Sequence, residues 1–495
     1  MYDAILFTGY TDSVVYYKPA GAYRIASIIR NAGFTCLVVD HLHAFTEDEL
    51  VEIINLSVGE NTKLIGVSTT FLQKTETSPS GYVSMHPIDI ENSFLPQGKD
   101  TENKIVSLAK KISPKLKIVL GGHKANHLLI KNSNVDLVAE GFFDNEIVRL
   151  LKGHTIPSVS THGLKYVCNR SMASENLNQY ITWNEIDVAP VNVLVTEFDR
   201  GCIFNCKFCA YPGRGKGIGE HLRNVESIRS ELLENYNNHG VKTYTISDLT
   251  INDSPEKVDL IYEATRNLPF DPVLFAYTRL DLLSKNPDTI HKLYDSGVRG
   301  FYFGVETLIP ESRGGIRKPK NFQKEMKTLE DMDRRYGNSI LTHGSFIVGL
   351  PGDTVENIRE TARLAKSMPF STYIFQTLML YKQAGNWNLS DLDKNYTDYG
   401  YVDCEPVNSI FVNWKNQYLT RTQAAELASE LNIDARNQPR FRIPAQLAWG
   451  LMNYDYSWHD ITSMKYADLD WHVLSNKLAA LIDQYKKLLF SHLHK

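Results

Sequence analysis

Three cysteines lie within eight positions of one another in the stretch RGCIFNCKFCAYPG, residues 200–213. Cysteine binds metals as the thiolate, so Cys202, Cys206 and Cys209 together predict a metal site. Ferredoxin-type sequences supply a cysteine for every iron of a cluster. A set of three would leave one iron of a [4Fe–4S] cluster open, and that iron could hold a substrate.

A structural zinc ion is the alternative interpretation of the same cysteines. Such sites usually combine one C-x-x-C with a second one further along the chain, and no second one follows here. A fourth ligand would have to come from elsewhere, for example from His221. On this hypothesis the chain is a zinc-stapled binding protein without enzymatic activity.

The composition limits the classes of protein that are possible. The 495 residues are 43% hydrophobic and 22% charged, which is typical of globular proteins and enough for two to four domains. A net charge of -4 does not indicate a nucleic acid or an anionic membrane as partner. No apolar stretch of ~18 residues is present, so we expect no membrane-spanning helix. The N-terminus lacks a signal-peptide pattern, and six cysteines with three in one loop do not predict a disulfide framework. We therefore expect a cytoplasmic protein.

The first part of the chain alternates short β-branched runs with helical patterns. The runs are at 4–8, 35–39, 63–68, 116–122 and 135–141, and the helical patterns are at 22–33, 48–57, 102–112 and 144–153. This alternation predicts a doubly wound (Rossmann/flavodoxin-like) α/β domain with a parallel sheet over residues 1–152. Gly33 and Gly153 stand where helices should end. Residues 71–100 form a long polar interruption, and residues 153–190 are predicted to be a linker.

The alternation starts again after residue 190. Six strands are predicted at 191–197, 242–247, 273–278, 300–304, 340–350 and 371–380, with helical patterns between them. Six β/α units predict a partial TIM barrel, (β/α)6, over residues 191–382, with its chemistry at the carboxyl ends of the strands. The cysteines follow the first of these strands and so fall on that face. Residues 383–495 have helical periodicity and predict a helical C-terminal domain.

The spacing C-x-x-x-C-x-x-C after the first strand of such a barrel resembles the radical S-adenosylmethionine (SAM) enzymes. The segments TISDLTIN (245–252), FAYTRLDLL (275–283), GVRGFYFGVETLIPESRGGIRK (297–318) and HGSFIVGLPGDT (343–354) resemble the later strand ends of that family. The resemblance implies a [4Fe–4S] cluster on Cys202, Cys206 and Cys209, whose open iron chelates SAM. It also implies a set of residues that contact SAM: Phe208, Ser247, Asp248, Arg279, Glu306, Val348 and Gly349. The presence of Phe208 is explained equally well by packing, and that of Arg279 by a surface ion pair. Asp353 or Thr354 could instead cap the helix that follows.

The front domain resembles the cobalamin-binding domain that precedes many radical SAM enzymes. Many such domains carry D-x-H-x-x-G after the first strand, and its histidine binds cobalt. The corresponding stretch here is TGYTDSVVYYKPAG (8–21), which has no histidine. Three interpretations are therefore open: cobalamin binds without a lower ligand from the protein, another residue approaches the cobalt, or the domain binds no cobalamin. His123, in GGHKAN, is better explained as part of a glycine turn that admits the nucleotide tail than as a ligand.

Taken together, the two resemblances imply a radical SAM enzyme that transfers a methyl group with the help of cobalamin. The alternative within the same chemistry is an isomerase, dehydrogenase or cyclase that does not use cobalamin. We expect a small-molecule substrate and a reducing partner such as flavodoxin or ferredoxin. No basic stripe predicts a nucleic acid partner.

Overall fold

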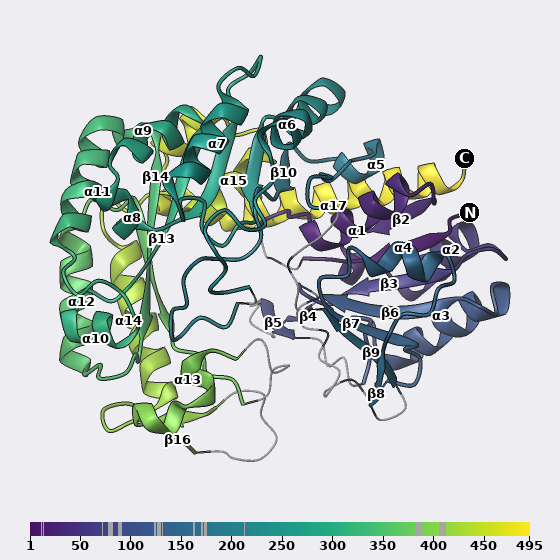
Figure 1. The fold of residues 1–495 in the computed structure, drawn as a ribbon, viewed down its shortest axis with the longest axis horizontal. Coiled ribbons are helices and arrows are strands. Elements are labelled where there is room, and N and C mark those ends of the chain that lie inside the picture. The colour runs from purple at the N-terminus through teal and green to yellow at the C-terminus, as the bar shows by residue number, and fades with distance from the viewer. Residues whose placement is uncertain are drawn as a thin grey trace. The chain divides into compact units, whose positions relative to one another are not determined.

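The computed structural model describes the chain except for residues 11, 13, 72, 78–82, 88–91, 123–124, 126–129, 131, 162–163, 170–171, 173–175, 212, 383–388 and 405–411, and for residues 73–77 and 83–87 it describes the backbone only. The chain divides into two compact units, and Figure 1 labels many of their elements. The first unit is Met1–Thr196, Ser230–Val241 and Trp471–Lys495, and the second is Glu197–Arg229 and Lys242–Asp470.

The first unit is an α/β layer built on a seven-stranded sheet. Its strands are β1 (Ala4–Phe7), β2 (Cys36–Val39), β3 (Leu64–Ser68), β6 (Lys117–Gly122), β7 (Leu137–Gly141), β8 (Val159–Thr161) and β9 (Leu164–Asn169), with a separate hairpin of β4 (Gln73–Thr77) and β5 (Val83–Pro87). Its helices are α1 (Ala20–Asn31), η1 (Leu42–Ala44), α2 (Glu47–Ser57), α3 (Lys99–Ile112), α4 (Glu146–Leu151), α5 (Glu185–Val188) and α17 (Trp471–Leu493).

The sheet of this unit has the order β2-β1-β3-β6-β7-β9-β8, and all its pairs are parallel except β8 with β9. The direction of winding reverses between β1 and β3, which is where doubly wound sheets bind ligands. The predicted doubly wound domain is thus confirmed. The segment 153–190, predicted as a linker, contributes β8 and β9 to this sheet. Strands as short as these leave little periodicity in the sequence.

Local sequence signals explain how several of these helices begin and end. Thr46 accepts a hydrogen bond from the backbone N–H of Glu49, and the Glu49 carboxylate accepts one from Thr46 N–H, so a capping box starts α2. Gly33 and Gly153 adopt φ values of 86° and 80° just past α1 and α4. The predicted helix ends at these two glycines are confirmed.

The last helix, α17, returns to the core of the first unit. Tyr485 and Leu489 belong to the same buried apolar cluster as Phe7 and Ile118. The Tyr485 hydroxyl accepts a hydrogen bond of 2.8 Å from the backbone N–H of Asp40. A helix near the C-terminus therefore completes the apolar core that packs on a sheet formed by the first third of the chain.

The substitution Tyr485→Phe is expected to lower the free energy of unfolding by about 1–3 kcal/mol, because it leaves a buried backbone N–H without its acceptor. Chemical denaturation followed by circular dichroism measures the change. Tyr418, which is 45% exposed, provides the control, since Tyr418→Phe should change stability by less than about 0.5 kcal/mol. Equal effects of the two substitutions on the free energy of unfolding would contradict the proposed contribution of this hydrogen bond to stability.

The second unit contains most of a parallel sheet and the helices that flank it. Its strands are β11 (Thr243–Ile246), β12 (Val273–Thr278), β13 (Val298–Glu306), β14 (Leu341–Val348), β15 (Thr372–Thr377), and the short pair β16 (Val402–Asp403) and β17 (Trp414–Lys415). Its helices are α7 (Pro255–Thr265), α8 (Leu280–Lys285), α9 (Asp288–Asp295), α10 (Pro310–Gly315), α11 (Gln323–Tyr336), α12 (Val355–Ser367), α13 (Asp391–Lys394), α14 (Arg421–Arg436), α15 (Ala445–Met452) and α16 (Trp458–Ser463), with 3-10 turns η2 (Gly337–Ser339), η3 (Tyr396–Tyr399) and η4 (Tyr466–Asp468). Helix α6 (Val225–His239) begins in the second unit and continues in the first.

The strand order of the second sheet follows the chain, from β10 (Val193–Thr196) through β11, β12, β13 and β14 to β15. The pairs from β11 to β15 are parallel. Figure 1 shows α9, α11 and α12 along one side of β13 and β14. This is the predicted six-stranded partial barrel followed by helices. No described helix combines the length and the apolar character needed to cross a membrane.

Candidate functional site

The three cysteines lie in the irregular segment between β10 and α6. The N–H of Cys202 donates to the Gly213 carbonyl at 2.9 Å, and Gly215 N–H donates to the Cys202 carbonyl at 2.8 Å. The Cys209 N–H donates to the Cys206 carbonyl at 3.2 Å. All three thiols are free and partly buried, so backbone hydrogen bonds hold the loop while the sulfur atoms remain open to ligation.

The surroundings of the cysteines affect how they would bind a metal. Burial raises the pKa of the Cys202 thiol, and it raises the pKa of Cys209 to about 11. The Cys202 and Cys209 thiols are thus protonated near neutral pH. Because metals bind thiolates, loading the site must release these protons.

The donor set fits an iron–sulfur cluster better than a single ion. Among the residues that the structure describes, no three His, Cys, Asp or Glu side chains come close enough together to hold one metal ion. In a cluster, by contrast, each cysteine binds a different iron, so the sulfur atoms do not have to converge on one point. His221, the proposed fourth zinc ligand, has a backbone φ of 57°, and its carbonyl accepts a hydrogen bond from Arg200 N–H.

Arg279 is a predicted site residue that contacts a cysteine of the loop. Its Nη1 lies 3.5 Å from the Cys206 sulfur. Its Nε and Nη2 bind the two carboxylate oxygens of Asp281 at 2.9 and 2.8 Å. The guanidinium carbon lies 3.7 Å from the centre of the Phe204 ring, so Arg279 contacts the cysteine loop at two points.

Asp248 binds the segment that leads into the cysteine loop. Its Oδ1 accepts hydrogen bonds from the backbone N–H groups of Phe198 and Asp199 at 2.8 and 3.2 Å. Its Oδ2 lies 2.8 Å from the Nζ of Lys257. The side chain is 0% exposed, so in this structure the Asp248 carboxylate supports the segment that leads into the loop. Ser247, the neighbouring predicted residue, is exposed just after β11.

Lys257 and Lys216 join Asp248 to further buried carboxylates. Lys257 Nζ lies 3.0 Å from Asp199 Oδ2, and Lys216 Nζ pairs with the same oxygen. Lys216 also lies 3.6 Å from Asp253. Burial alone would lower the pKa of Lys257, but the carboxylates of Asp248 and Asp199 raise it above its ordinary value. We call Asp199, Lys216, Asp248, Asp253 and Lys257 the buried ion network.

Glu306 ends β13 in a strained backbone conformation. Its φ is 70°, which is unusual for a residue other than glycine. Its carboxylate lies 3.2 Å from Lys318 Nζ, and a Cβ on Gly304 would approach Glu306 Oε1 to 2.6 Å. Strain of this kind concentrates at functional sites, which favours the predicted role of Glu306.

Val348 is the last residue of β14 and Gly349 begins the turn that follows, and the fold already uses the carbonyl groups of both. The Val348 carbonyl accepts from Leu378 N–H at 2.9 Å, and the Gly349 carbonyl accepts from the Tyr401 hydroxyl at 2.7 Å. A Cβ on Gly349 would lie 2.5 Å from the Trp414 ring, so only glycine fits there. Phe208 lies half-buried in the cysteine loop.

The predicted helix cap after this turn is confirmed. The Thr354 hydroxyl accepts a hydrogen bond from Asn357 N–H at 3.1 Å and starts α12. The Asp353 carboxylate instead accepts from Leu350 N–H and from the Ser312 hydroxyl. Of the two residues considered for the cap, Thr354 performs it.

Sequence reasoning missed a row of side chains on the inner face of the second sheet. Tyr277, Tyr302, His343 and Thr372 are register partners across β12, β13, β14 and β15, so they share one face. The rings of Tyr277 and Tyr302 lie 5.1 Å apart. The alternation in FAYT and THGSF was the signal that could have indicated this row.

His343 is expected to make the protein less stable in acid. Burial lowers its pKa to about 4, so the folded state keeps the ring neutral while the unfolded chain binds a proton below its ordinary pKa of about 6.5. Stability is therefore lost as the pH falls through 6.5 towards 4. Between pH 7.5 and 5.5 this histidine alone should remove about 1.4 kcal/mol from the free energy of unfolding.

Denaturation of wild type and His343→Gln at both pH values tests this. The variant should lose that part of the pH dependence, and His459→Gln, at an exposed position, should keep it. An unchanged pH dependence in His343→Gln would contradict the assignment.

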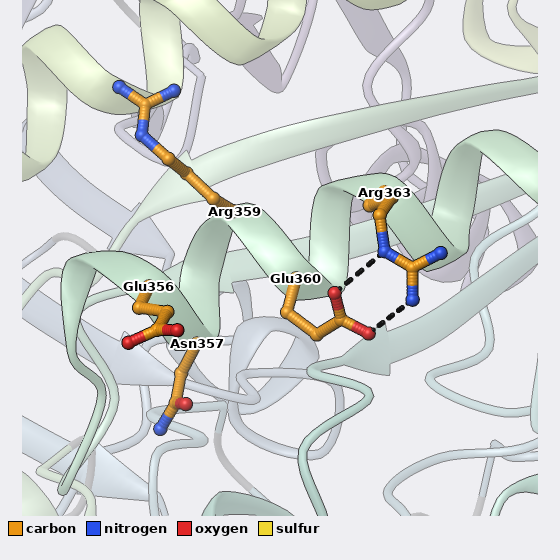
Figure 2. A pocket seen from close by; sticks show the side chains of 5 residues that line it. All are labelled: Glu356, Asn357, Arg359, Glu360 and Arg363. Carbon is orange, nitrogen blue, oxygen red and sulfur yellow. Dashed lines mark hydrogen bonds and ion pairs between the residues drawn. The ribbon is translucent and has the colours of Figure 1, made fainter.

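A hollow of about 360 Å³ also lies along α12 (Figure 2). It is lined by Glu356, Asn357, Arg359, Glu360 and Arg363. Arg363 pairs with Glu360 at 2.6 Å, and Arg359 pairs with Glu430 at 2.8 Å. This is an exposed helix face that carries two ion pairs, and we assign it no function.

The comparisons with known proteins agree with this site. The family model of the Radical SAM superfamily matches residues 196–365, which include the cysteine loop and the strand ends described above. An uncharacterized methyltransferase of Pyrococcus horikoshii is 25% identical over 263 residues, which are 52% of this chain and 54% of the relative. The match thus spans about half the length of that relative.

Solved structures share the fold over most of the chain. The radical SAM methyltransferase TsrM from Kitasatospora setae, solved with cobalamin and a [4Fe–4S] cluster, has a TM-score of 0.65 and 14% identity; the match covers 98% of this chain and 100% of TsrM. The cobalamin-dependent SAM radical enzyme OxsB has a TM-score of 0.55 and 12% identity, with 80% and 56% covered. At these identities the likeness establishes the fold. Residues 196–365 of this chain thus match the Radical SAM superfamily.

Proposed function

We propose that this chain is an enzyme that cleaves SAM reductively and, with the help of cobalamin, transfers a methyl group to an unactivated carbon of a small molecule. The observation that carries the proposal is the cysteine loop, with three free thiols at the start of a Radical SAM domain. Cys202, Cys206 and Cys209 would hold a [4Fe–4S] cluster. When bound, that cluster supplies the electron that splits SAM into methionine and a 5′-deoxyadenosyl radical.

The residues around the loop support SAM binding at the same end of the sheet. Ser247 is exposed after β11, and the carboxylate of Glu306 stands at the end of β13 beside Lys318. We propose that Ser247 and Glu306 contact SAM directly, with Phe208 beside it. The backbone at Val348 and Gly349 would face the adenine, and Asp248 would act by supporting the loop.

The first unit supports a large flat ligand at the point where its sheet reverses direction. The rings of Tyr10, Tyr17 and Phe71 lie 5.0 to 5.9 Å from one another, after the carboxyl ends of β1 and β3. A Cβ on Gly122, at the end of β6, would approach Thr70 Oγ1 to 2.6 Å, so the backbone there accepts only glycine. Cobalamin, with its flat ring, fits this edge and would supply a methyl carrier there. His123 lies outside the described residues.

The substrate is proposed to bind on the inner face of the second sheet. Parallel sheets normally have both faces covered, but Tyr277 is 51% exposed on β12. Gln376 on β15 is also exposed, and Thr245 and Ser345 are half-buried. These side chains are uncharged and offer hydroxyl, phenol and amide groups, which suits a small polar substrate without a strong charge. TsrM, which shares the fold, was solved with tryptophan as substrate.

Anaerobic reconstitution with iron, sulfide and cobalamin tests the proposal, followed by mass analysis of products after reduction with SAM. We expect 5′-deoxyadenosine together with S-adenosylhomocysteine, because one SAM supplies the radical and another the methyl group. A protein that forms the cluster but takes up no cobalamin would refute methyl transfer by this route. A colourless protein with one zinc ion would refute the radical chemistry as well.

An isomerase, dehydrogenase or cyclase without cobalamin is the second candidate. The absence of a histidine in the stretch 8–21 favours it, and one relative, 20% identical over 188 residues, is an anaerobic magnesium-protoporphyrin IX monomethyl ester cyclase of Rubrivivax gelatinosus. This candidate predicts 5′-deoxyadenosine without S-adenosylhomocysteine. The reducing partner is proposed to be a flavodoxin or ferredoxin, and the location of the enzyme is proposed to be the cytoplasm.

A further inference from the structure

The backbone at Arg279 is fixed where β12 passes into α8. Arg279 N–H donates to Asn252 Oδ1 at 2.8 Å, and Asn252 Nδ2 donates back to the Arg279 carbonyl at 3.0 Å. Asn252 belongs to the segment that follows β11. The side chain of Arg279 is 10% exposed, so both ends of the residue are held in place.

The guanidinium group of Arg279 is oriented by three different partners. The two-point contact with Asp281 fixes its plane, because a carboxylate and a guanidinium match in geometry. The Phe204 ring lies under the guanidinium carbon at 3.7 Å, a cation–π contact. With the plane fixed in this way, Nη1 is directed at the Cys206 sulfur, 3.5 Å away.

We propose that Arg279 is a positioning residue of the cluster, which donates a hydrogen bond to the Cys206 sulfur and makes the cluster easier to reduce. This inference rests on the proposed function, since it requires the cluster. Three thiolates give a [4Fe–4S] cluster a net negative charge that grows on reduction. A cation and a hydrogen bond at one sulfur therefore stabilise the reduced form more than the oxidised form.

This role differs from the direct SAM contact that the sequence predicted for Arg279. A residue that binds SAM should alter the affinity for SAM and leave the potential of the SAM-free cluster unchanged. A residue that acts through Cys206 should alter the potential of the SAM-free cluster. The two roles can be separated by measuring both quantities on the same variants.

The test is a redox titration of the reconstituted, SAM-free protein with dithionite, followed by electron paramagnetic resonance. In Arg279→Gln, the ratio of reduced to oxidised cluster at a fixed potential should fall about tenfold, which is about 59 mV for one electron. Arg279→Lys keeps a positive charge without the planar fork, and its ratio should fall by less. Arg334→Gln, at a side chain that is 74% exposed on α11, is the matched control and should behave as wild type.

The possible results separate the inference from the proposed function. If wild type forms no cluster, the proposed function fails. If Arg279→Gln forms a full cluster at the wild-type potential, the inference fails while the proposed function stands, and a loss of SAM affinity would then assign Arg279 to SAM. If Arg279→Gln does not retain iron, Arg279→Lys decides: a lowered potential supports the inference and an unchanged one overturns it.

Discussion

Replacing Cys206 with alanine is expected to abolish both the iron–sulfur chromophore and the cleavage of SAM, down to the background of a protein-free control. Only three cysteines lie in the loop, so the loss of one leaves two ligands for a cluster that already has an open iron. The protein cannot substitute for chemistry that the cofactor performs. Iron and sulfide content, absorbance near 400 nm and 5′-deoxyadenosine yield after anaerobic reconstitution measure the effect.

The same loss is expected for Cys202→Ala and Cys209→Ala. Cys404 is free and exposed and lies outside the loop, so Cys404→Ala should retain the cluster and the activity. A Cys206→Ala protein with full iron content and normal SAM cleavage would show that the three cysteines are not the cluster ligands. Melting temperatures near that of wild type would show that the loss is not one of folding.

Replacing Lys257 with methionine is expected to lower the free energy of unfolding by about 3–5 kcal/mol. The methionine has a similar size, but it leaves Asp199 and Asp248 as buried carboxylates that have lost a shared cation. Removing one partner of a buried ion pair is costly because the remaining charge stays out of water. Urea denaturation followed by circular dichroism measures the change.

The control for this substitution is Lys292→Met. Lys292 pairs with Asp259 on the surface, where the two side chains are 41% and 55% exposed, so its loss should cost no more than about 1 kcal/mol. Because Asp199 and Lys216 of the buried ion network stand on either side of the cysteine loop in the chain, Lys257→Met should also reduce the yield of cluster on reconstitution. If Lys257→Met and Lys292→Met had equal free energies of unfolding, water or a rearrangement of the neighbouring side chains would be shown to compensate for the missing lysine at position 257.

The sequence was sufficient to predict most of the fold, because each strand of a buried parallel sheet is a short apolar run followed by a turn residue. It was not sufficient for β8 and β9, which are short, partly exposed strands with little periodicity. It also predicted helices over 383–495 but not that α17 packs in the first unit. That placement depends on contacts such as the one between Tyr485 and Asp40, which are 445 positions apart.

The site was predicted less evenly than the fold. The cysteine trio stands out because ligand spacing is a local property of the chain. The partners of Arg279 and Asp248 could not be predicted, since which donor meets which acceptor depends on where strand ends meet in space. Charged residues after parallel strands indicate the active edge, but they do not reveal whether a side chain meets a ligand or supports a loop.

The return of α17 has a consequence for biosynthesis. Asp40 and Tyr485 leave the ribosome far apart in time: at 5 to 20 residues per second, 445 positions take about 20 to 90 seconds. During that interval the nascent front sheet exposes the apolar surface that α17 will later cover. Chaperones are expected to occupy this surface while translation continues, and the isolated fragment 1–196 should aggregate unless the last helix is supplied as a separate peptide.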